Sequence, residues 1–124
     1  MTDAARIREA LAALCFRAGV APADGSEAAG RAVFAAVARE LRAHPTDVLL
    51  CPVQQWLSER LPDVRGWVHA GKVILPGAGR LVERRRKRRS AAGERDCERV
   101  ALPAAVACAV RLFDEFQVRL PEVA

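Results

Sequence analysis

The most constraining feature of this sequence is a segment near its C-terminus, Leu102 to Leu120, whose first half is entirely uncharged. Residues 102–110 contain no charged side chain at all. Apolar residues recur there at intervals of three or four, the spacing that places side chains on one face of a helix. Pro103 lies near the expected first turn, where its missing N–H costs nothing. A helix that is apolar around most of its circumference has to be packed on more than one side. Residues 102–117 are therefore predicted to form the central core helix.

A first amphipathic helix is expected at the N-terminus, from about Asp3 to Ala18. Its apolar residues recur at helical spacing, so one face is available for burial against the rest of the fold. Thr2 or Asp3 is the expected N-cap, and Gly19 is placed to end the helix in a left-handed conformation.

A second helix is expected after a short turn. It begins at Asp24 and Glu27, a pair spaced like a capping box, and it ends before His44-Pro45. Gly30 lies inside this helix at a cost in helix stability, which we attribute to the close approach of another helix. The first and second helices are expected to form an antiparallel helical hairpin over residues 3–43.

The middle of the chain predicts a short helix and a small β segment. The helix is expected over residues 52–61, because its first residue is a proline. Trp67 to His69 and Lys72 to Leu75 flank a two-residue turn with a glycine, which is typical of a β-hairpin. Arg80 to Val82 is expected to add a third strand, so the β segment covers residues 66–82.

Together these elements predict an α+β fold. It is a mostly helical single domain with an N-terminal helical hairpin, a small antiparallel β-hairpin or meander, and a C-terminal core helix. A length of 124 residues suits one domain with a core of its own. A composition of 52% apolar and 28% charged residues is typical of a globular protein.

Neither a membrane span nor a secretory signal is evident in the sequence. No apolar run approaches the ~20 residues that a transmembrane helix needs. The N-terminal segment carries Asp3 and Glu9 and has no long apolar block. We therefore expect a soluble, cytoplasmic protein without a membrane partner.

The net charge of +5 originates in one segment. Residues 80–99 hold nine basic and four acidic side chains, so the remainder of the chain is balanced. Residues 83–98 lack apolar periodicity, and we expect them to form an exposed, mobile basic loop. A run of like charges repels itself, and nucleic-acid phosphates relieve this repulsion without reading sequence. The residues expected to contact DNA or RNA phosphates are Arg80, Arg84, Arg85, Arg86, Lys87, Arg88, Arg89 and Arg95, assisted by Arg99.

Other partners are left open. An acidic protein surface is the alternative ligand for the basic loop. A protein-interaction module, such as an accessory or inhibitory factor of a phage or mobile element, would instead use an apolar surface patch. Trp56 and Trp67 are the candidate anchors of such a patch, although core packing is the favoured role for both. A homodimer through the helices is a further alternative.

No catalytic or cofactor motif accompanies the basic run. None of the serines lies in a GxSxG context, and no helix pair resembles a helix-turn-helix. The four cysteines, Cys15, Cys51, Cys97 and Cys108, are spaced unlike zinc ligands. Cys15 and Cys108 are expected to be small buried hydrophobic residues. We therefore expect a non-enzymatic protein that uses no cofactor and no metal.

Two segments of the second half resemble a known pattern. Cys51-Pro52-Val53 opens a short helix, and Leu102 to Asp114 reads LPAAVACAVRLFD. These segments are similar to small uncharacterised proteins of actinobacteria and their phages, in which a CP-initiated helix precedes a sheet and an LPxxVxxFVxxFD helix. The aromatic residue in the middle of that helix is replaced here by Ala109 or Val110, and the basic insertion departs from the pattern. The resemblance implies one α+β domain and an origin in a mobile element, but no activity and no functional residues.

Overall fold

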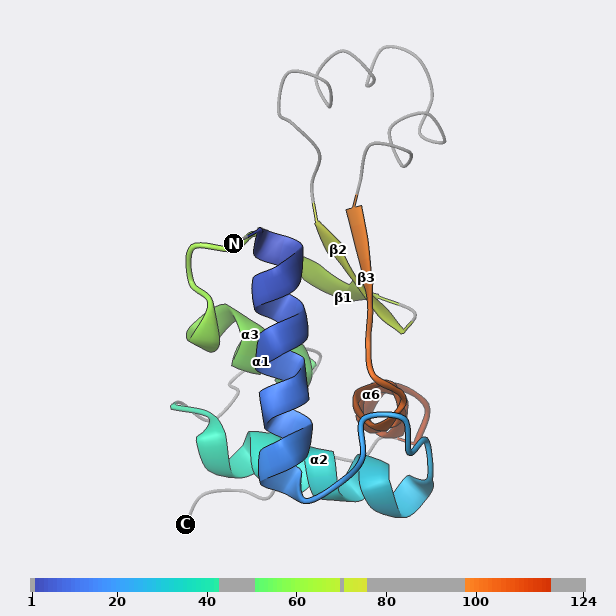
Figure 1. Cartoon of the computed structure of the whole chain (residues 1–124). Coiled ribbons are helices and arrows are strands. Elements are labelled where there is room, and N and C mark those ends of the chain that lie inside the picture. The colour runs from blue at the N-terminus through green and yellow to red at the C-terminus, as the bar shows by residue number, and fades with distance from the viewer. Residues whose placement is uncertain (1, 43–50, 70, 76–97, 117–124) are drawn as a thin grey trace.

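The structure, a computed structural model, describes residues 2–42, 51–69, 71–75 and 98–116. Within these ranges the chain forms a mostly helical α+β domain with one small antiparallel sheet (Figure 1), so the predicted fold class is confirmed. The elements, in chain order, are α1 (Asp3–Ala18), α2 (Glu27–Glu40), α3 (Pro52–Arg60), β1 (Trp67–His69), β2 (Lys72–Leu75), β3 (Glu98–Ala101) and α6 (Ala104–Phe116). No helix in the described part of the chain is long and apolar enough to cross a bilayer.

Local capping chemistry fixes the bounds of α1. The hydroxyl of Thr2 accepts a hydrogen bond from the Ala5 N–H at 3.1 Å, and Gly19 ends the helix with φ +74°. A side-chain oxygen satisfies one of the free N–H groups of a first turn, and a glycine adopts a left-handed conformation without steric cost. Both predicted ends of this helix are confirmed.

The predicted start and end of α2 are wrong by a few residues. Ser26, rather than Asp24, is the N-cap, and its hydroxyl accepts from the Ala29 N–H at 3.1 Å. Asp24 instead accepts from the Ser26 N–H at 3.0 Å and so shapes the turn before the helix. The helix ends at Glu40 because Leu41 is extended (φ −64°, ψ 131°). His44-Pro45, the predicted end, lies outside the described residues.

The first two helices pack on each other but do not form the predicted antiparallel hairpin. An ion pair of 2.7 Å joins Arg17, at the C-terminal end of α1, to Glu40, at the C-terminal end of α2. In an antiparallel hairpin the end of the first helix would meet the start of the second. The segment 19–26 instead carries the chain away before α2 begins, and α2 then runs back across the lower end of α1 (Figure 1).

Helix α6 is the core helix, as predicted. It contacts α1, α2 and α3, and its Ala105, Val106 and Ala109 are completely buried. The helix starts two residues later than predicted: Pro103 precedes it, and the Pro103 carbonyl accepts the Ala107 N–H at 2.8 Å. The remaining core comes from the inward faces of α1, α2, α3 and the sheet: Ile7, Leu11, Leu14, Val33, Val37, Val53, Trp56, Val73 and Val100.

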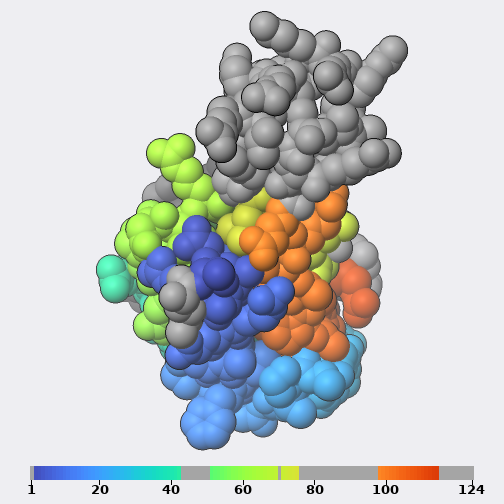
Figure 2. Space-filling view, turned by 45° about the horizontal axis from the view of Figure 1, so that its top comes forward, coloured from blue at the N-terminus to red at the C-terminus, as the bar shows by residue number. Residues whose placement is uncertain are grey.

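The sheet has the strand order β1-β2-β3, with both pairs antiparallel. The predicted hairpin of β1 and β2 is confirmed, and Gly71 in its turn has φ +79°. The third strand is β3, which the sequence analysis did not predict and whose first residue, Glu98, had been assigned to the basic loop. Residues 80–82, the predicted third strand, lie outside the described residues. α1 and β3 lie side by side on one face of the molecule (Figure 2).

Gly30 lies where α2 crosses α6, which confirms the predicted close approach. A Cβ atom at this position would lie 2.5 Å from the Cys108 Sγ, 2.9 Å from the Cys108 Cβ and 3.2 Å from the Ala109 nitrogen. Such distances cannot be accommodated unless one of the two helices shifts. The absent side chain is therefore what allows the two helices to pack this closely.

We expect the substitution Gly30→Ala to destabilise the fold by about 1–2 kcal/mol, because overpacking outweighs the roughly 1 kcal/mol that alanine gains in helix propensity. Chemical denaturation at neutral pH measures the difference. Gly25→Ala is the control: its Cβ would lie 3.5 Å from the Ala104 Cβ, an ordinary contact, so stability is expected to change by less than about 0.5 kcal/mol. A Gly30→Ala protein more stable than the parent would contradict the packing argument.

Candidate functional site

The basic residues predicted to bind phosphates all lie outside the described residues: Arg80, Arg84, Arg85, Arg86, Lys87, Arg88, Arg89 and Arg95. The residues that flank them are described: β2 ends at Leu75, β3 begins at Glu98, and these two residues are partners in the sheet register. The chain therefore leaves β2 and enters β3 at the same end of the sheet.

The two tryptophans have opposite environments. Trp56 is only 2% exposed, and its Nε1 donates a hydrogen bond to the Glu40 Oε1 at 3.1 Å. Its alternative role as an exposed partner-binding anchor is therefore wrong, and the favoured core role is correct. Trp67, in β1, is 48% exposed, so for this residue the prediction of a core role is wrong. The large aromatic surface of the sheet is thus supplied by Trp67.

The strands alternate between a buried and an open face of the sheet. Val68, Val73 and Val100 are aligned across the three strands on the inner face, which α1 and α3 cover. The neighbouring positions in each strand must face the opposite side, because successive side chains of a strand alternate. Two cross-strand rows result on the outer face: Trp67, Ile74 and Arg99 form one, and His69, Lys72 and Ala101 form the other.

The outer face carries positive charge without carboxylates. Of its six residues, Lys72 and Arg99 are cationic and none is acidic. Within the described residues, neither Lys72 nor Arg99 takes part in an ion pair. Arg99 and Trp67 are exposed, whereas Lys72 and Ile74 are half-buried. This face combines an exposed aromatic ring with two cations that no carboxylate of the described chain neutralises.

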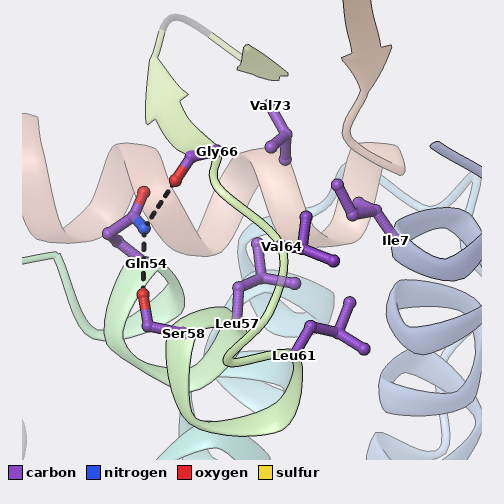
Figure 3. Close-up of a pocket in the computed structure, with 8 residues that line it drawn as sticks. All are labelled: Ile7, Gln54, Leu57, Ser58, Leu61, Val64, Gly66 and Val73. Atoms are coloured by element: carbon purple, nitrogen blue, oxygen red, sulfur yellow. Dashed lines mark hydrogen bonds between the residues drawn. The ribbon is translucent and has the colours of Figure 1, made fainter. Parts of the chain in front are cut away.

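Gln54, a residue of α3, holds β1 in position. Its Oε1 accepts a hydrogen bond from the Val68 N–H at 2.6 Å, and its Nε2 donates to the Gly66 carbonyl at 3.1 Å. The same Nε2 also donates to the Ser58 hydroxyl at 3.2 Å (Figure 3). Trp67 lies between the two backbone groups that Gln54 binds, so its backbone is fixed on both sides. Sequence reasoning missed Gln54, because nothing in a short polar stretch indicates which glutamine faces inward.

The pocket beneath the sheet is small. Ile7, Gln54, Leu57, Val64 and Val73 are among the residues around it (Figure 3), and its volume is 10 Å³. This is about the room required by one water molecule, which is too little for an organic ligand. The candidate site is therefore the outer face of the sheet, because the pocket under the sheet is too small to hold a ligand.

A shallow groove of 370 Å³ between α1 and α3 is a second candidate for an anion site. Three guanidinium groups line it, but each one is already bound to a carboxylate. Arg6 holds Asp63 through two hydrogen bonds of 2.6 and 3.0 Å, whereas Arg17 and Arg60 both hold Glu40. An incoming anion would have to displace these carboxylates. The groove is thus less suited to phosphate than the outer face of the sheet.

Glu40 joins three helices through its carboxylate. Arg17 of α1 donates to both of its oxygens at 2.7 Å, and Arg60 and Trp56 of α3 donate to Oε1 at 2.5 and 3.1 Å. Arg60 also lies over the Trp56 ring, 5.2 Å from its centre. The pKa of Glu40 is lowered to about 2, and the hydrogen bonds from Arg17 are the largest cause. The hydrogen bond from Trp56 and the charge of Arg60 lower it as well, whereas partial burial opposes the shift.

The cysteines behave as predicted where the structure describes them. Cys15 and Cys108 are buried, and desolvation raises the pKa of the Cys15 thiol. Cys51 precedes α3 and is half-buried, and Cys97 lies outside the described residues. Among the described residues, no three His, Cys, Asp or Glu side chains are grouped closely enough to hold a metal ion.

We expect Glu40→Gln to destabilise the protein by up to about 3 kcal/mol at pH 7, since a pKa about two units below the ordinary value is worth roughly that much. The folded-state pKa is depressed, so this stabilisation is present above the unfolded pKa near 4.5 and is lost as the pH falls toward 2. Denaturant titrations between pH 7 and pH 3 are expected to show the two proteins converging on acidification.

The matched control for this experiment is Glu27→Gln. Glu27 also binds an arginine, Arg31, at 2.8 Å, but both side chains are more than half exposed. An exposed helical pair of this kind contributes about 0.3–0.5 kcal/mol. An equally small effect at Glu40, or a difference independent of pH, would contradict a stabilising role for the Glu40 carboxylate.

Comparison with known proteins adds no identity: no family model, no curated protein and no solved structure matches the chain. The resemblance to actinobacterial and phage proteins therefore stays a prediction.

Proposed function

We propose that this protein is a non-enzymatic binding protein that holds nucleic-acid phosphates with little preference for sequence. The observation that carries the proposal is the open face of the sheet, where Lys72 and Arg99, which no carboxylate of the described residues neutralises, share one face with the exposed Trp67. Cations contact the phosphates of DNA and RNA alike, and such contacts supply affinity without reading bases.

The position of the basic run in the chain supports the same proposal. The residues between Leu75 and Glu98 include all six of Arg84 to Arg89, and their ends are the paired ends of β2 and β3. The net charge of +5 is carried by residues 80–99 alone. The excess charge therefore adjoins the sheet in the chain, and it has the same sign as the outer face.

In the described part of the chain, ion pairs neutralise four of the seven arginines of the helices and neither of the two cations of the sheet. Arg6, Arg17, Arg31 and Arg60 of the helices each bind a carboxylate at 2.8 Å or less. Those cations are already neutralised, whereas Lys72 and Arg99 are not neutralised by any described carboxylate. A phosphate gains most from cations that have no competing partner.

A protein-interaction module remains the alternative proposal, and Trp67 is the observation in its favour. Aromatic residues are enriched at the energetic centres of protein interfaces. Trp67 lies directly across from Ile74, so the outer face also has an apolar centre. An acidic protein partner would use the same two cations, and a second copy of the chain would use the apolar centre.

We expect the protein to bind a fluorescently labelled 20-nucleotide DNA with an affinity that falls steeply with salt concentration. The double variant Lys72→Gln/Arg99→Gln is expected to reduce the slope of log affinity against log salt by about 1.4 on a single strand, because each phosphate contact contributes about 0.7. Replacing Arg84 to Arg89 by Gln is expected to abolish binding. Fluorescence anisotropy between 25 and about 300 mM salt measures both effects, the Debye length changing several-fold over that range.

The matched control is Arg31→Gln/Arg39→Gln, which removes the same formal charge from two exposed positions of α2, a helix away from the sheet. It is expected to leave the salt slope nearly unchanged. Equal losses in both double variants would show that net charge alone governs binding, and binding without salt dependence would refute the proposal. Thermal melting of all variants verifies that they are folded.

A further inference from the structure

We infer that the ligand of the sheet face is a single strand of nucleic acid and that Trp67 stacks on one of its bases. This inference deepens the proposed function and rests on it. Phosphate contacts alone would be satisfied equally by a duplex or a single strand. The aromatic residue on the edge strand of the cationic face is what distinguishes between them.

The exposed residue Trp67 is held in a defined position by its neighbours. Gln54 binds the backbone of the residues on either side of it, and the register sets it directly across from Ile74. A position held this firmly presents the same side chain in the same place, yet 48% of its surface is open to solvent. A tryptophan has a large apolar surface, and a planar ring stacked on it would shield the exposed part of that surface from water.

Both cations lie on one side of this ring, because β1 is an edge strand, and their distances from it suit the phosphates of neighbouring nucleotides. Arg99 is two strands away in the same row, which corresponds to about 10 Å because neighbouring strands are ~4.8 Å apart. Lys72 is the diagonal neighbour of Trp67 on β2, at a typical separation of about 7–8 Å. A base lying on Trp67 thus has two positive side chains available on the side of β2 and β3.

Only an unpaired strand has base faces available for such contact. In a duplex each base is covered by its neighbours, whereas single-stranded binding proteins combine a cationic surface with aromatic side chains on which bases stack. Stacking tolerates any base, since every base has a flat face. This agrees with the absence of sequence preference in the proposed function.

The experiment compares four labelled probes of equal length: a 20-nucleotide single-stranded DNA, the same sequence as a duplex, an abasic 20-mer with phosphates but no bases, and poly-L-glutamate. Anisotropy titrations at one low salt concentration give the affinity for each. The parent protein is expected to bind the single strand roughly tenfold more tightly than the abasic strand, since a stacked base contributes about 1–3 kcal/mol.

The variant that tests the stacking ring is Trp67→Ala. It is expected to lose about tenfold in affinity for the single strand and almost nothing for the abasic strand, whereas Trp67→Phe retains most of the affinity. Phe16→Ala is the matched control, because Phe16 is an even more exposed aromatic residue, 85% accessible, on α1 rather than on the sheet. It is expected to change none of the affinities.

The outcomes distinguish a failure of the stacking inference from a failure of the proposed function on which it rests. Equal, salt-dependent affinities for the single strand, duplex and abasic strand, unaffected by Trp67→Ala, would overturn the stacking inference and leave phosphate binding intact. Tighter binding to the duplex would also overturn it. Binding to poly-L-glutamate as tight as to the single strand, or no binding to any nucleic acid, would overturn both in favour of an acidic protein partner or another function.

Discussion

Close packing between α2 and α6 is the constraint on which the rest of the fold depends. Gly30 leaves no side chain at the crossing, so the backbone of α2 approaches Cys108 and Ala109 directly. Helix α6 is held there at its start as well: the Ala105 N–H donates to the Pro22 carbonyl at 3.1 Å. The linker between α1 and α2 and the body of α2 therefore both determine where the core helix lies.

The position of α6 in turn determines what the sheet presents to solvent. β3 ends only two residues before α6, and the intervening Leu102 is buried and donates its N–H to the Gly71 carbonyl at 3.0 Å. With the end of β3 fixed, alternation directs Val100 into the core and Arg99 outward. The open cationic face is thus a consequence of core packing and requires no binding partner to form.

Much of the fold could be predicted because local chemistry determines it. A hydroxyl at Thr2, a glycine at position 19 and a proline at position 52 mark helix ends through contacts within one turn. β3 could not be predicted in the same way, since only Val100 of its four residues is buried and four residues are too few to show a periodicity. Its strand character comes from pairing with β2, which is separated from it by 22 residues of sequence.

The candidate site shows the same division between local and distant contacts. The excess positive charge is visible in composition, and Trp67 was noted for its size. Its exposure was not predictable, because whether a tryptophan lies inside or outside depends on which face of the sheet the helices cover. The bonds from Gln54 to β1 and from Arg17 to Glu40 join residues that are 14 and 23 positions apart, and no spacing rule indicates them.

The hydrogen bonds between Gln54 and the backbone around β1 have a consequence for self-association. An edge strand normally displays unpaired N–H and carbonyl groups, which invite a strand from another molecule and lead to aggregation. Here a side-chain amide occupies the outward-facing groups of Gly66 and Val68 much as a neighbouring strand would. Because the Gly66 carbonyl and the Val68 N–H are occupied in this way and β1 is only three residues long, this edge is a poor template for extension into a fibril.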